Sequence, residues 1–152
     1  MDWKGFVNRL KQLPANVTNL ALPCPPERIA EERVRLGSWP SDLAEMLIVF
    51  NGGELFVDAM PFVTIFGLSL ADDPPELEWS IDKFTPKWRA AMQRPNEWII
   101  GITNYGGIFV ADENNVVREW DSAQKQWTNK PLSFDEWADF IFVEGQKCLN
   151  DE

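Results

Sequence analysis

The stretch SDLAEMLIVFNGGELFV, residues 41–57, decides the fold, because its apolar pattern changes there from helical to extended spacing. Leu43, Leu47 and Phe50 recur every three to four residues, which is typical of a helix with one buried face. Asn51-Gly52-Gly53 then ends the helix, since both residue types tolerate left-handed backbone angles. The apolar residues that follow predict a strand.

The residues before this stretch predict two further helices. Apolar residues recur at near-helical spacing over 6–13. Pro25-Pro26 opens the second helix, because proline suits a first turn, and Gly37 suits the position just past its end. Ser41 follows Pro40 and is a good N-cap for the third helix.

The residues after this stretch predict mainly strands, at 55–57, 62–66, 98–102, 108–110, 116–120 and, more weakly, 126–127. Residues 71–78 predict a surface loop, and Thr85-Pro86 predicts the start of a helix that ends near Met92. Ser133 and Glu136 form a capping box that opens the last helix. We therefore predict one α+β domain over residues 1–152, with an antiparallel meander of about five to six strands, helices packed on one side and helices at both termini.

The composition limits the classes of function. The formal net charge is −10 and the sequence pI is about 4.5, so the chain repels phosphate backbones and direct nucleic-acid binding is not expected. The charge either steers the protein toward a basic partner or only keeps it soluble. Histidine is absent, which excludes Ser-His-Asp and Cys-His relays and any zinc site with a histidine ligand. We expect no catalysis, no cofactor and no metal.

The cysteines and the apolar runs predict a cytoplasmic protein. Cys24 and Cys148 lie near opposite ends of the chain and are expected to be reduced thiols. The first residues lack the pattern of a signal peptide. No apolar run approaches the roughly 20 residues that span a bilayer, so no membrane partner is expected.

Two acidic turns are the candidate binding surfaces. Their residues are Asp72, Asp73, Glu76, Glu78 and Trp79 in the first turn, and Asp112 and Glu113 in the second. A tryptophan beside carboxylates suits an interface hot spot, whereas the alternative is a ring folded back over the sheet edge among solvated turn residues. Paired carboxylates also leave a glycosidase-like hydrolase as a minor alternative.

The order of short motifs resembles the SUKH superfamily, which includes fungal Smi/Knr-type cell-wall assembly regulators and many bacterial immunity proteins. The motifs are Ile29-Ala30-Glu31-Glu32, Leu36-Gly37, Trp39-Pro40, Asp42-Leu43, Leu47, Asn51-Gly52-Gly53-Glu54-Leu55-Phe56, Trp98-Ile99-Ile100-Gly101, Gly107-Ile108-Phe109-Val110 and Ser133-Phe134-Asp135-Glu136-Trp137. They cover nearly the whole chain. Trp39 stands where relatives usually have Leu, and Tyr105 occupies a turn that is often acidic in them.

The resemblance implies a non-catalytic protein-binding domain. Its most specific implication is a bacterial immunity protein that binds and neutralises a basic toxin domain, for example a nuclease, of a polymorphic toxin system. The alternative is an intracellular scaffold or regulator without a toxin partner. In either case the motif residues Gly37, Pro40, Asn51, Gly52, Gly53 and Ser133 are expected to have structural roles.

Overall fold

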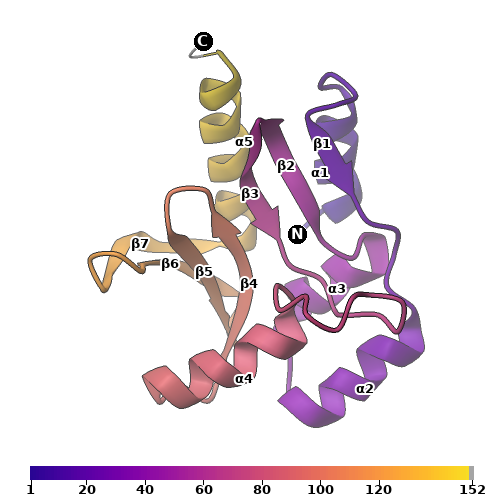
Figure 1. Cartoon of the computed structure of the whole chain (residues 1–152), viewed down its shortest axis with the longest axis vertical. Coiled ribbons are helices and arrows are strands. Elements are labelled where there is room, and N and C mark those ends of the chain that lie inside the picture. Colours follow the sequence, from indigo (N-terminus) through magenta and orange to yellow (C-terminus); the bar gives the residue numbers. More distant parts are fainter. Residues whose placement is uncertain (151–152) are drawn as a thin grey trace.

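The sheet of this computed structural model, which describes residues 1–150, has seven strands that pair antiparallel in the order of the sequence (Figure 1). The strands are β1 (Thr18–Leu20), β2 (Gly53–Asp58), β3 (Met60–Ile65), β4 (Glu97–Thr103), β5 (Gly107–Asp112), β6 (Val116–Asp121) and β7 (Gln126–Ser133). The helices are α1 (Trp3–Lys11), α2 (Pro26–Leu36), α3 (Ser41–Val49), α4 (Ile81–Met92) and α5 (Phe134–Asn150). The predicted α+β meander with a helix near each end is thus confirmed, with more strands than the expected five to six.

One face of the sheet packs against the terminal helices. Trp137 of α5 contacts Phe109 of β5 with ring centroids 5.4 Å apart, and Trp3 of α1 contacts Trp137 at 6.5 Å. Trp3 also packs against Phe50, directly after α3. The helices α1, α3 and α5 therefore enclose the main core on one face of the sheet.

The other face, here called the outer face, is covered in part by α4. Trp88 of α4 contacts Trp120 at 6.0 Å and Trp127 at 6.1 Å. Trp120 pairs with Ile108, the neighbour of Phe109, and successive residues of a strand point to opposite faces. The same register continues through Ile102, Thr64, Glu54 and Asn19, so these residues share the outer face as far as β1.

Helix α4 begins at Ile81, earlier than the start predicted at Thr85-Pro86. Ser80 caps it by accepting from the backbone N–H of Lys83 at 3.3 Å, and Pro86 lies inside the helix. Proline has no N–H, so it cannot donate to the Asp82 carbonyl one turn earlier. Arg35 of α2 donates to that carbonyl at 2.7 Å instead, which explains why the helix continues through a proline.

Most of the expected structural residues have the expected roles. Gly37 and Gly52 have φ of 89° and 80°, and Ser133 and Glu136 form the capping box. The N-cap predicted at Ser41 is wrong, because Pro40 occupies the cap position and the Ser41 hydroxyl accepts from the side chain of Asn115. Within residues 1–150, no helix is both long and apolar enough to cross a membrane.

A double-mutant cycle tests how Pro86 is tolerated. Arg35→Ala is expected to lower the free energy of unfolding by about 1–2 kcal/mol, because it removes a donor from the Asp82 carbonyl. In the Pro86→Ala background the restored backbone N–H takes that carbonyl, so the same change should cost about 1 kcal/mol less. Urea denaturation of the four proteins measures the difference, and equal costs in both backgrounds would contradict the explanation.

Candidate functional site

Residues 67–80, which join β3 to α4 and are called the 67–80 loop below, close on themselves. The backbone N–H of Ile81 donates to the Gly67 carbonyl at 2.9 Å. The side chain of Asn51 accepts from the Leu68 N–H at 2.8 Å and donates to the Leu68 carbonyl at 2.9 Å. Asn51 thus binds the loop as a neighbouring strand would, a role beyond the helix end predicted for it.

Gly52 and Gly53 follow Asn51, and glycine is required at both positions because other backbone segments lie against them. A Cβ on Gly53 would lie 2.6 Å from the carbonyl oxygen of Asn19 and 2.8 Å from the Cα of Leu20. A Cβ on Gly52, which also has a positive φ, would meet the backbone of Ile65 and Gly67. The two glycines therefore let β1 and the start of the 67–80 loop approach the end of α3.

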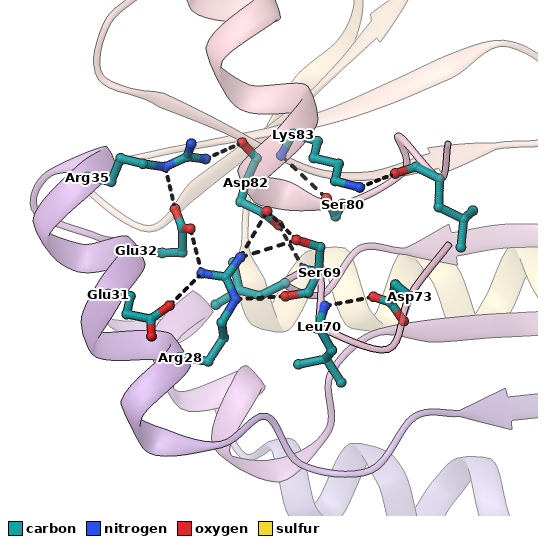
Figure 2. A network of polar contacts seen from close by, with 12 residues as sticks. Arg28, Glu31, Glu32, Arg35, Ser69, Leu70, Asp73, Ser80, Asp82 and Lys83 are labelled. Atoms are coloured by element: carbon teal, nitrogen blue, oxygen red, sulfur yellow. Dashed lines mark hydrogen bonds and ion pairs between the residues drawn. The ribbon is translucent and has the colours of Figure 1, made fainter. Parts of the chain in front are cut away.

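A charge network fixes the loop to α2 and α4 (Figure 2). Arg28 of α2 donates to the Ser69 carbonyl at 2.7 Å, to Glu32 at 2.6 Å and to Asp82 at 3.0 Å. Asp82 of α4 in turn accepts from the Ser69 N–H at 2.8 Å and from the Ser69 hydroxyl. Figure 2 shows Arg35 completing the ring between Glu32 and the backbone of Asp82.

The network keeps Asp82 ionised although it is buried. Burial by itself raises the pKa of a carboxyl, but the hydrogen bonds from the side chain and backbone of Ser69 outweigh it and hold the pKa of Asp82 below its usual range. The pKa of Arg28 is raised, because the bond to Glu32 and the charges of Glu32 and Asp82 outweigh its own burial. Both groups are therefore charged at neutral pH.

Further contacts within the loop determine its shape. Asp73 accepts from the backbone N–H of Leu70 at 2.7 Å. Lys83, in the first turn of α4, donates to the Leu77 carbonyl at 2.7 Å. The loop is thus held at its start, in its middle and at its end.

A groove of about 360 Å³ lies between this loop and the outer face of β1–β3. Its floor includes Asn19, Glu54 and Thr64, and its wall includes Leu70, Leu77 and Trp79. The three wall side chains are 39%, 49% and 60% exposed. Exposed apolar side chains gathered around a hollow commonly mark a surface that contacts another molecule.

The structure separates the sequence-predicted binding residues into two places. Asp73 and Trp79 line the groove, and Asp72, Glu76 and Glu78 are exposed on the same loop, where Glu78 pairs with Lys87 at 2.9 Å. Asp112 and Glu113 line a different hollow together with Arg94. Asp112 accepts from the backbone N–H groups of Asn114 and Val116, so its carboxylate shapes the β5–β6 turn.

Sequence reasoning missed several residues of the groove, both in the sheet and in the acidic loop. Glu54 was quoted only as part of the Asn-Gly-Gly motif, and Asn19 lies in a strand that was not predicted. Leu77 stands between two glutamates and carries no periodic signal. Register between β1 and β2 pairs Asn19 with Glu54, and register is not readable from one strand alone. Closure of the 67–80 loop brings Leu77 to the same groove.

A buried carboxyl at Glu119 bears on the hydrolase alternative. Burial raises the pKa of Glu119; the hydrogen bond from Tyr105 opposes that shift and the nearby Asp121 adds to it. The adjoining cavity, lined also by Trp137, holds about 10 Å³, which is room for about one water molecule. The geometry therefore supports no substrate site at this carboxyl.

Two further kinds of functional site are a reactive thiol and a metal site. Cys24 is buried, and that burial raises the pKa of its thiol to about 11, which makes it a poor nucleophile. Within residues 1–150, no three Cys, Asp or Glu side chains gather as a metal site would require.

In comparisons with known proteins, no model of a protein family matches the chain, and no curated protein matches it.

The charge on Asp82 predicts how stability depends on pH. A carboxyl whose pKa is lowered by folding contributes stability above its unfolded pKa of about 3.9, and that stability is lost as the pH falls through the folded value. Asp82→Asn should therefore cost about 2–4 kcal/mol at pH 7 and progressively less below about pH 4. Urea denaturation across this range measures it; Asp72→Asn is the matched control on an exposed site, and a cost that does not vary with pH contradicts the prediction.

Glu119 predicts a dependence of stability on pH that is opposite to that of Asp82. A carboxyl whose pKa is raised by folding contributes stability below its unfolded pKa of about 4.3, and that contribution is lost as the pH rises through the folded value. Glu119→Gln is expected to raise the free energy of unfolding at pH 7 by about 1 kcal/mol and to change it little below pH 4. Glu113→Gln, on an exposed turn, is the control; destabilisation by Glu119→Gln at pH 7 would show that the carboxylate itself is needed.

Proposed function

We propose that this chain is a cytoplasmic, non-catalytic protein-binding domain, and that its groove binds a basic toxin domain as an immunity protein does. The observation that carries the proposal is the gathering of Leu70, Leu77 and Trp79 as exposed side chains around one groove. Interface hot spots are enriched in tryptophan and surrounded by contacts that exclude water.

The charge of the chain supports a basic partner. The formal net charge is −10, and the 67–80 loop itself carries Asp72, Asp73, Glu76 and Glu78. Acidic groups around an apolar centre speed association with a positively charged surface and disfavour partners of like charge. A nuclease site is such a surface, because it must hold phosphate.

The resemblance to the SUKH superfamily supports an immunity role and gains a physical basis in this chain. Its Asn-Gly-Gly motif binds the base of the 67–80 loop through Asn51. Glu32 of its Ile29-Ala30-Glu31-Glu32 motif, on α2, accepts from Arg28, which holds the same loop. Several of the motifs that carry the resemblance thus belong to segments that build the groove. Membership of the superfamily stays a proposal.

Rescue from toxicity tests the proposed function. Co-expression with the toxin encoded beside its gene should restore growth, and the purified chains should form a complex. Leu77→Ala is expected to weaken that complex about tenfold, and Trp79→Ala about thirtyfold or more, because both remove the apolar centre of the groove. Calorimetry measures the dissociation constants.

Leu22→Ala is the matched control for Leu77→Ala. Leu22 is 84% exposed and is not among the groove residues, so its truncation should change affinity less than twofold. If the neighbouring gene product is harmless, or rescue fails although the chain is expressed and folded, the immunity proposal is wrong. Recovery of several endogenous signalling or envelope-synthesis proteins in a pull-down would support the scaffold alternative instead.

A further inference from the structure

The polar lining of the groove is one-sided in charge. Glu54 on the floor and Asp73 in the wall each bring a carboxylate, and Asn19 and Thr64 add further oxygen acceptors. The lining residues include no Lys and no Arg. The groove therefore favours a ligand group that carries positive charge and several hydrogen-bond donors.

The N-terminus of α4, which lies at the groove, does not reverse the preference for a positively charged ligand group. Ser80, the N-cap of α4, also lines the groove, and a helix N-terminus by itself favours an anion. Asp82 in the first turn already supplies that negative charge, with a pKa held low by its bonds to Ser69. The Ser80 hydroxyl is also engaged, since it accepts from the N–H of Lys83.

The apolar wall identifies which cation fits. Trp79 presents an exposed indole in the groove that the two carboxylates also line, with Leu77 and Leu70 in the same wall. A guanidinium is planar, stacks on an indole face and offers five donors, whereas an ammonium is more strongly hydrated. A volume of about 360 Å³ lies at the lower end of the range of about 300–1,000 Å³ for ligand pockets, so it suits a side chain and not a whole segment.

From this geometry we infer that the groove is a receptor for an arginine side chain of the partner protein, stacked on Trp79 and paired with the carboxylates of Glu54 and Asp73. The inference rests on the proposed function for the origin of that arginine. The binding chemistry itself belongs to the groove and can be measured without the partner.

Titration with N-acetyl-arginine amide tests the groove directly. The indole ¹⁵N–¹H signal of Trp79, assigned as the one lost in Trp79→Phe, should shift and saturate within tens of millimolar of this probe. N-acetyl-citrulline amide has the same shape without the charge and should bind at least about fivefold more weakly. No shift of the Trp79 signal, or equal affinity for both probes, would overturn the inference.

A matched pair of variants locates the charge that matters. Glu54→Gln should weaken the arginine probe about three- to fivefold, because it removes one exposed carboxylate from the groove floor. Glu45→Gln removes one exposed carboxylate from α3, away from the groove lining, and should leave the affinity unchanged. Unchanged indole signals of the remaining tryptophans verify that both variants are folded. Equal effects of the two variants would show that only overall charge acts, and would also overturn the inference.

The two proposals fail in different ways. If the probe leaves Trp79 unmoved while Leu77→Ala still weakens a toxin complex, the proposed function stands and the arginine receptor is wrong. If the probe binds through Glu54 but no basic protein is captured, the arginine receptor stands and the immunity role is wrong.

Discussion

The guanidinium of Arg28 joins three segments that are far apart in the chain: its own helix through Glu32, the 67–80 loop through Ser69, and α4 through Asp82. These bonds are 2.6 to 3.0 Å long, and Glu32 and Asp82 are buried. Removing one member of such a cluster leaves the others buried without compensation, which costs more than breaking an exposed ion pair. Arg28 therefore joins α2, α4 and the loop at one point, and the contacts of Arg35 and Asn51 reinforce this arrangement.

The 67–80 loop is held in place, which favours the groove as a binding surface. Leu77 and Trp79 are exposed, yet the loop that carries them is held by Asn51 at Leu68, by Asp73 at Leu70 and by Lys83 at Leu77. A partner that binds a loop already held in place has less conformational entropy to remove, so more of the contact energy remains as affinity. The same contacts explain why the acidic residues of this loop have unequal roles, since some hold the loop in shape and others face solvent.

The sequence predicted well those elements whose signals lie within a few residues, and poorly those that depend on contacts with distant segments. Helical spacing of apolar residues predicted α1 and α3, the end signals at Pro25-Pro26, Gly37 and Ser133 predicted α2 and α5, and turn residues predicted the order of the central strands. Strand β1 was missed because three residues carry no periodic pattern and are held only by pairing with β2. The start of α4 was misplaced because Pro86 is typical of a first turn, and only Arg35, from another helix, makes an interior proline acceptable. Of the site, sequence found Trp79 and the acidic loop but not Glu54 and Leu77, which reach the groove through register and loop closure.

By itself the sequence determined the α+β class, the antiparallel meander, the caps at Gly37 and Ser133, and a charge of −10 without any histidine. These follow from residue spacing, backbone preference and composition, which act within a few residues or over the whole chain. Only the tertiary structure decided that Asp112 supports a turn while Glu54 and Asp73 meet Trp79 around a groove. The physical reason is that a carboxylate takes its role from the donors that folding brings to it, and those donors come from segments distant in the sequence.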